Sequence, residues 1–496
     1  MSADPRLALI GSTGLPLNGP ADRGVRRPPT FRPWPGSAAR DADPVRPGMM
    51  AGMRLNRARG GVLQRRDFRL LWLGETTSAL GSSISRLALP LVAVVTLDAG
   101  TFAVSMLTAA AWLPWLVVGL PAGAWVDRIA RRPLLLLCNT VSLLFLLSVP
   151  VAAAAGRLSM AQLYLVALIT GVASVFFQTG MQVYLPGVLP ADELGAANAA
   201  LQGSESVAQV AGPSLAGLIA QVFGAVAGLI VDAISFLVSG VCLLLIRTEE
   251  TRADRPVRTT SLRREIADGI RFVRTDPYLR VLTAYGALSN VALTGYQSIL
   301  VVFLVREIGV GPGTVGLLIS GMSVGGVLGA FVAGRVSRRL GTAHGMLLLE
   351  LVGAPFALLI PLADLALAFV VVGGIGVGVG IVGGNVINGS FRQAYTPRPL
   401  LGRVVVTMQF LNYGAIPVGA LLAGLLGTAL GLRPTMWIMA AWVAVASLVL
   451  LLGPVRHDRD LPKHPGPEPT GPTEPTEPTE PTEPTGPTEA VNARTL

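Results

Sequence analysis

Residues 134–155 read LLLLCNTVSLLFLLSVPVAAAA, an apolar stretch without a charged side chain. A helix of that length is about 30 Å long, because each residue adds about 1.5 Å, and this matches the hydrocarbon thickness of a bilayer. Eleven more stretches of this kind follow one another between about Leu70 and Gly453. We therefore predict an all-α, polytopic membrane protein with twelve transmembrane helices.

Composition supports the same class of protein. The chain is 51% hydrophobic and only 14% charged, and it contains 58 glycines, which packed membrane helices use for close approach. The predicted spans are 70–97, 103–125, 133–155, 160–182, 200–222, 226–246, 278–304, 313–335, 343–361, 365–389, 404–428 and 433–453.

The number of basic residues alternates from one predicted connection to the next. Connections after the even-numbered spans are rich in arginine, whereas those after the odd-numbered spans hold little beyond Arg157, Arg306 and Arg433. The positive-inside rule then places both termini and the long central loop in the cytoplasm, for a protein of the cell membrane. The net charge of +10 is a topology signal of this kind. No nucleic-acid partner is expected, since no aromatic residues interleave with the arginines.

A shift of about 207 residues aligns the two halves of the chain. It places Arg128, Arg131 and Arg132 on Arg335, Arg338 and Arg339, Leu194 and Gly195 on Leu401 and Gly402, and Gly212 and Gly217 on Gly419 and Gly424. One offset at several places indicates two six-helix repeats in the same orientation. The predicted parts are a disordered basic, Pro-rich arm (1–66), two bundles (67–246 and 278–454), a cytoplasmic linker between them (247–277), and a disordered Pro-Thr-Glu tail (455–496).

Within the linker, apolar residues recur at helical spacing at Leu262, Ile266, Ile270 and Val273, with arginines on the other face. This pattern predicts an amphipathic helix along the inner membrane surface, where its arginines meet anionic lipid head groups.

The connection between the second and third spans carries a motif, GAWVDRIARR at 123–132. It resembles the signature loop of the major facilitator superfamily, and Phe68–Pro90, Leu185–Asn198 and Asp232–Phe236 resemble the branch with macrolide-efflux proteins, the enterobactin exporter and lysophospholipid transporters. The resemblance covers about residues 65–455 and implies a cytoplasmic latch that stabilises the outward-open state. The latch residues are Gly123, Asp127, Arg128, Arg131 and Arg132.

The fifth span resembles the antiporter motif of exporters in this superfamily, through Gly212, Pro213 and Gly217. Glycines allow close helix contact and proline removes one backbone hydrogen bond, so the motif predicts a bend at which a gate moves. The sequence departs from the motif at Ala216, where glycine is usual. It also lacks, near Ala167, the arginine of many proton-coupled relatives.

Ionisable residues inside spans are candidates for function, because charge in the bilayer is costly. A carboxylate in a dry site binds and releases protons near neutral pH, since burial disfavours its charged form. We expect proton coupling at Glu205, with Glu75 and Asp232 as alternatives, and rank Glu350 last. Polar stripes on six spans predict the lining of the pathway: Ser78, Ser82, Arg86, Gln178, Gln182, Gln202, Gln209, Asn290, Thr294, Gln297, Asn385, Asn388, Gln409 and Asn412.

The function predicted from these features is proton-coupled export of amphipathic small molecules, such as a drug, a macrolide-like antibiotic or a siderophore, by a monomer. Neither a cofactor nor a metal is expected: both cysteines lie in predicted spans, and the single Lys463 is not part of a phosphate-binding Walker motif, so ATP does not drive transport directly. The alternatives are transport of lysophospholipids or other lipids, and, from a different class, a membrane sensor without turnover. None of these is an enzyme.

Overall fold

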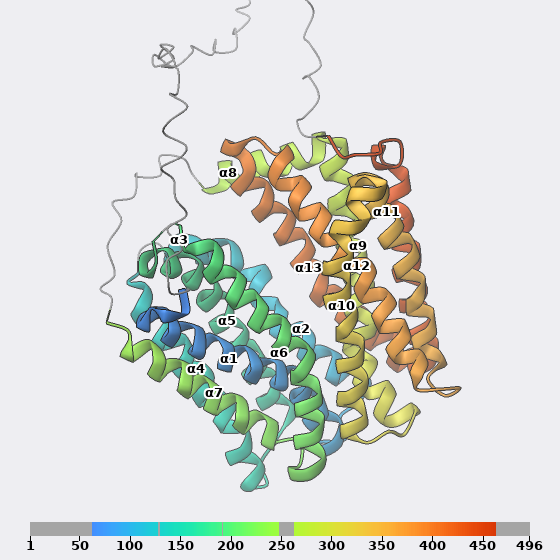
Figure 1. The fold of residues 1–496 in the computed structure, drawn as a ribbon. Helices are drawn as coiled ribbons and strands as arrows, with labels where there is room; N and C mark the ends of the chain where they lie inside the picture. Colours follow the sequence, from blue (N-terminus) through green and yellow to red (C-terminus); the bar gives the residue numbers. More distant parts are fainter. Residues whose placement is uncertain (1–61, 127–128, 191, 248–261, 463–496) are drawn as a thin grey trace, which may run out of the picture. The chain divides into compact units, whose positions relative to one another are not determined.

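A computed structural model describes residues 62–126, 129–190, 192–247 and 262–462, and these residues form helices without a β-strand. The first group of helices, here called the N-terminal bundle, comprises α1 to α7 (Figure 1). Their bounds are η1 Val62–Gln64, α1 Arg66–Leu91 with η2 Val92–Thr96, α2 Thr101–Val117, α3 Gly119–Val126, α4 Arg131–Ala154, α5 Met160–Val188, α6 Leu194–Phe223 and α7 Ala227–Leu245.

The amphipathic linker helix α8 (Leu262–Thr275) leads into the second group, the C-terminal bundle. Its helices are α9 Pro277–Val302 with η3 Phe303–Glu307, α10 Pro312–Leu340, α11 Thr342–Gly353 with η4 Ala354–Leu362, α12 Ala368–Tyr395, α13 Arg398–Leu430, and α14 Leu432–Ser447 with η5 Leu448–Leu452 and η6 Pro454–Arg456.

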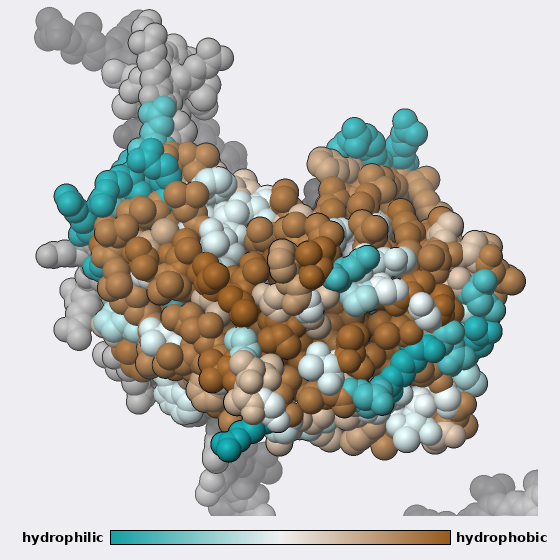
Figure 2. Space-filling model, turned by 90° about the horizontal axis from the view of Figure 1, so that it is seen from below, coloured by the Kyte–Doolittle hydropathy of each residue, from teal (hydrophilic) through white to brown (hydrophobic). Residues whose placement is uncertain are grey.

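The all-helical membrane prediction is confirmed. In the described residues eleven helices are long and apolar enough to cross a bilayer. The second predicted span is realised as α2 and α3, which are separated at Val118 and contain prolines at 114 and 121. Leu137, Leu144 and Val151 lie about two turns apart along α4 and are exposed, as expected for side chains that face lipid. Figure 2 shows apolar residues over most of the surface on the view from below.

The main contacts between the bundles are those of α6 with α10 and of α2 with α13, and α9 also contacts α1 and α2. The two main contacts obey the internal repeat. A Cβ added to Gly217 on α6 would lie 2.8 Å from the Cα of Gly316 on α10. A Cβ added to its repeat partner, Gly424 on α13, would lie 2.8 Å from the Cβ of Ser105 on α2. Both contacts are at the helix ends opposite α8. We call the end that carries α8 the linker end and the opposite one the far end.

Helix α8 packs on α13, because a Cβ at Gly269 would lie 2.5 Å from Thr407 Oγ1 and 2.8 Å from the Arg403 carbonyl oxygen. Val273 is buried, whereas Arg271 and Arg274 are exposed. The amphipathic pattern does not predict this contact with the C-terminal bundle.

Residues 454–462 also pack on the linker end, beyond the boundary predicted at 454. Asp460 Oδ1 accepts a hydrogen bond of 2.8 Å from the Thr342 N–H at the start of α11. Tyr278 donates to Asp458, and Leu461 is buried. The rest of the predicted tail and the predicted N-terminal arm up to residue 61 lie outside the described residues.

Candidate transport pathway

Four charged residues inside the transmembrane helices of the N-terminal bundle interact with one another. Glu205 on α6 interacts electrostatically with Glu75 and Arg86, both on α1. Arg86 also interacts with Asp232 on α7. The structure therefore gives Arg86 partners on neighbouring helices, three turns from Glu75 along α1.

Glu205 and Arg86 are exposed although each lies well inside a transmembrane helix. A charged side chain that faced lipid would cost several kcal/mol, so these groups require contact with water. Gln209 Nε2 donates a 3.4 Å hydrogen bond to Glu205 Oε1 from the next helical turn. The polar stripe of α6 is thus suited to line an aqueous route.

Asp232 has a different environment. It is 2% exposed, and Ser235 donates a 3.0 Å hydrogen bond to its Oδ1. A Cβ at Gly81 of α1 would lie 2.5 Å from the same oxygen, so α1 and α7 are in close contact at this carboxylate. This placement fits a residue that holds two helices together inside one bundle.

Glu350 on α11 is also buried and accepts a hydrogen bond from Tyr285 on α9. A Cβ at Gly384 of α12 would overlap its carboxylate. The three helices enclose Glu350 within the C-terminal bundle.

An aromatic cluster crosses the boundary between the bundles. The ring of Tyr413 on α13 lies 5.6 Å from that of Trp112 and 5.2 Å from that of Trp115, both on α2. Tyr413 also interacts electrostatically with Glu205 and with Arg392 of α12. Neither tryptophan is among the site residues predicted from the sequence, although the two lie three residues apart and therefore on one face of a helix.

The remaining lining candidates divide by exposure. Those with exposed side chains are Gln178, Gln182, Gln202, Gln209, Gln297, Asn385 and Gln409. Ser78 and Thr294 are buried, and Ser82, Asn290, Asn388 and Asn412 are half-buried. Asn290 donates to the Gly286 carbonyl within α9, whereas Asn412 of α13 lies against Gly286, so Asn412 serves the contact between α9 and α13.

The antiporter motif, formed by Gly212, Pro213 and Gly217, lies at two contacts between helices. Gly212 packs on Ser83 of α1, where a Cβ would be 2.5 Å from the serine Cβ, and Gly217 packs on α10. After Pro213, the Ser214 N–H donates to Ser320 Oγ of α10 at 2.8 Å. The partner surface of α10, with Gly313, Gly316 and Ser320, was not singled out from the sequence, although its small residues at helical spacing are a usable signal.

Two latch residues, Asp127 and Arg128, lie outside the described residues. Gly123 lies in the middle of α3 with open space around it, and Arg131 begins α4. Arg132 donates a 2.8 Å hydrogen bond to the Leu244 carbonyl oxygen at the last turn of α7. A cation suits that position because the C-terminus of a helix carries partial negative charge.

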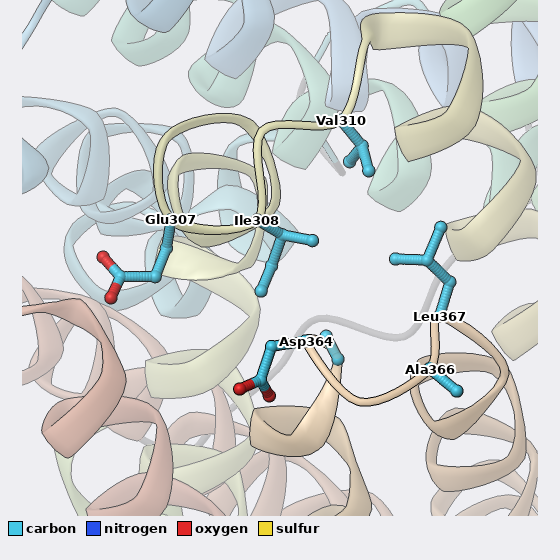
Figure 3. A pocket seen from close by; sticks show the side chains of 7 residues that line it. Glu307, Ile308, Val310, Asp364, Ala366 and Leu367 are labelled. Carbon is cyan, nitrogen blue, oxygen red and sulfur yellow. The ribbon is translucent and has the colours of Figure 1, made fainter.

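A pocket of about 410 Å³ lies at the far end of the C-terminal bundle, between the connections that follow η3 and η4. Figure 3 shows apolar side chains on both sides, Ile308 and Val310 opposite Leu367, with Glu307 and Asp364 at the edge. It is separate in sequence and position from the charged groups of α1 and α6.

Comparisons with known proteins agree with this architecture. The multidrug efflux pump Tap of Mycolicibacterium fortuitum is 28% identical over 405 residues, which cover 80% of this chain and 98% of Tap. A crystal structure of a bacterial homologue of the iron transporter ferroportin in its inward-facing state has a TM-score of 0.64 at 18% identity and covers 79% of this chain and 99% of the homologue. The outward-facing state of that homologue has a TM-score of 0.54, at 18% identity and with 78% and 99% of the two chains covered.

The family model described as transmembrane secretion effector matches residues 61–470, which include both bundles and the linker between them. Together with the two helical repeats, this match shows that the chain belongs to the transmembrane secretion effector family of the major facilitator superfamily, a superfamily of transporters.

Proposed function

We propose that this protein exports amphipathic small molecules of drug size across the cell membrane in exchange for protons. The observation that carries the proposal is the aromatic cluster of Tyr413, Trp112 and Trp115 at the boundary between the bundles, where Tyr413 also interacts electrostatically with Glu205. Aromatic rings offer apolar contact to a substrate, and an ionisable group in the same region can couple its movement to a proton. The naming of a similar protein as a multidrug efflux pump supports drug-like compounds as first substrates.

The proposed coupling group is Glu205, and Glu75, with which it interacts electrostatically, is the next candidate. The two carboxylates lie on different helices, so a change of charge on one acts on the other across α1 and α6. Asp232 is the weaker candidate because it is buried between α1 and α7 within one bundle. Exchange by alternating access requires only that the site around Glu205 opens to one side of the membrane at a time.

We also propose that the linker end is cytoplasmic. Described arginines at that end include Arg247, Arg271, Arg274, Arg338 and Arg339, whereas the far end has Arg157, Arg306 and Arg433 beside the acidic Asp98, Glu307 and Asp364. The positive-inside rule favours this orientation. Single-cysteine labelling with an impermeant reagent tests it in protein without Cys138 and Cys242. Labelling of a cysteine at Arg157 from outside supports it, and labelling at position 260 from outside contradicts it.

The transport test uses purified protein in liposomes with an acidic lumen. Ethidium and radiolabelled erythromycin, supplied outside, should accumulate as protons leave, and an uncoupler should abolish accumulation. Lysophosphatidylcholine, tested in parallel, represents the alternative of lipid transport. If no probe moves, the export proposal fails, and if movement ignores the pH gradient, the coupling proposal fails.

A further inference from the structure

An ion pair joins the two bundles at the far end. Arg306 Nη2, in η3 of the C-terminal bundle, lies 2.6 Å from Asp98 Oδ1, in the connection between η2 and α2 of the N-terminal bundle. The Asp98 side chain is 94% exposed and that of Arg306 30% exposed. Apart from this contact, the aspartate is therefore surrounded by solvent.

The backbone of Asp98 is unusual. Its φ angle is +47°, and among the described residues every other positive φ belongs to a glycine: Gly156, Gly224, Gly309, Gly341 and Gly431. A side chain disfavours this left-handed conformation, although aspartate and asparagine tolerate it better than most residues. Asp98 therefore occupies a position at which glycine would be relaxed.

The internal repeat shows the relaxed alternative. The helices α1 and α9 both end in a five-residue π-helical turn, η2 and η3, and the next turn has the same hydrogen bonds in each. Ala99 N–H donates to the Ala93 carbonyl at 2.9 Å, and Val310 N–H donates to the Leu304 carbonyl at 3.1 Å. The residue with positive φ is Gly309 in the second repeat and Asp98 in the first.

The other half of the ion pair is anchored within its own bundle. Arg433 on α14 lies 3.0 Å from Asp364 and 3.8 Å from Glu307, the residue directly after Arg306. In Figure 3 the carboxylates of Glu307 and Asp364 turn to the same side of the pocket. These contacts hold the end of η3 on the C-terminal bundle, so Arg306 moves with that bundle.

We infer that Asp98 and Arg306 form a clasp that stabilises the state with the far ends closed, and that Asp98 occupies a glycine position in order to form it. This inference rests on the proposed alternation between two states. In the proposed orientation the clasped state is inward-facing. The pair must separate when the far ends open, so its interaction energy favours only the clasped state and sets the balance between the two.

The test measures opening of the far end without a transported substrate. Ser105, which is fully buried between α2 and α13, is replaced by cysteine in protein without Cys138 and Cys242. An impermeant maleimide added from outside then reports opening as the labelling rate. Asp98→Asn keeps the size and the tolerance for positive φ but removes the charge. It should raise the rate about 1.5- to five-fold, the range expected for an exposed ion pair.

Matched variants separate charge from backbone and from general effects. Arg306→Gln should raise labelling as much as Asp98→Asn, the double variant no further, and Arg306→Lys should stay close to the parent. Asp98→Gly should match Asp98→Asn if charge is decisive. Glu193→Gln breaks an ion pair inside one bundle, 2.6 Å long and formed with Arg65, and should leave the rate unchanged.

Salt provides a second readout, because ions screen exposed charges. Raising ionic strength from about 0.01 to 1 M should speed labelling of the parent more than that of Asp98→Asn. The inference is overturned if Asp98→Asn and Arg306→Gln label like the parent, or if Glu193→Gln has the same effect. Because no drug is involved, failure of the export assay would leave this result interpretable.

Discussion

Replacement of Gly217 by alanine should open the far end of the protein. An added Cβ would lie 2.6 Å from the Pro312 carbonyl oxygen and 2.8 Å from Gly316 Cα, both backbone atoms of α10 in the other bundle. Backbone cannot move aside as a flexible side chain can. Such overpacking costs roughly 1–3 kcal/mol. The cost falls only on the state with the far ends in contact, so the equilibrium should shift by about five- to 150-fold toward the open one.

The measurement is again labelling of Ser105→Cys from outside. This reporter lies on the contact between α2 and α13, whereas Gly217 lies on the contact between α6 and α10. A faster rate would therefore show that both contacts open together, as expected when each bundle moves as one body.

Gly203→Ala is the matched control. It lies on the same helix α6, and a Cβ there would meet nothing within 4 Å. Both substitutions gain about 1 kcal/mol of helix propensity, so this gain cancels in the comparison. If Gly217→Ala labels at the rate of Gly203→Ala, the close contact does not limit opening and the assignment of Gly217 to the gate is wrong.

Three further predictions concern coupling, the latch and the C-terminal segment. Glu205→Gln should abolish the accumulation of ethidium that a pH gradient drives in liposomes, because an amide cannot bind and release a proton, while binding of ethidium persists. If accumulation by the variant still depends fully on the gradient, Glu75 becomes the coupling candidate. Asp127→Asn should lower efflux with normal membrane insertion, since loss of about 1–3 kcal/mol from one state shifts populations five- to 150-fold; an unchanged efflux rate would remove the latch assignment. Asp460→Ala should lower the midpoint of thermal unfolding, because it removes a helix cap worth about 0.5–2 kcal/mol. Truncation after residue 462 should leave the midpoint unchanged. Equal midpoints for the parent, Asp460→Ala and the truncated protein would show that the cap is unimportant.

The helical architecture could be predicted from the sequence because the bilayer fixes the length and polarity of each span. The fourth span, predicted at 160–182, begins where α5 begins but ends six residues earlier than Val188. Such ends are harder to predict, since helices continue past the hydrocarbon layer where polar residues are tolerated. Hydropathy alone does not show this continuation.

Contacts between helices were less predictable. Arg86 is visible in the sequence as an isolated charge, but its partners Glu205 and Asp232 come from helices more than a hundred residues away. Local rules also assign the wrong residue at the end of η2. Gly100 is the expected residue for a positive φ, but its φ is −63°, and Asp98 has the positive value. The turn that follows the π-helix places the positive φ at Asp98, as the corresponding turn after η3 places it at Gly309.

The glycines of the two kinds of interface explain why the bundles should move as bodies. Within the C-terminal bundle, a Cβ at Gly325 would lie 2.4 Å from the Ile375 carbonyl oxygen, and one at Gly329 would lie 2.8 Å from that of Val379. The helices α10 and α12 therefore touch backbone to backbone over two turns, and sliding one past the other would break close packing throughout.

The bundles also touch closely near the far end, backbone to backbone at Gly217 and Gly316 and through Gly424 on Ser105. The hydrogen bond from Ser214 to Ser320 adds to these contacts, and the rings of Tyr413 and Trp112 follow toward the middle of the membrane. Rotation of the bundles apart at the far end would separate these contacts and the Asp98–Arg306 pair, and would leave the packing inside each bundle intact. Release of a substrate on that side requires this motion, and the contacts between the bundles set its cost.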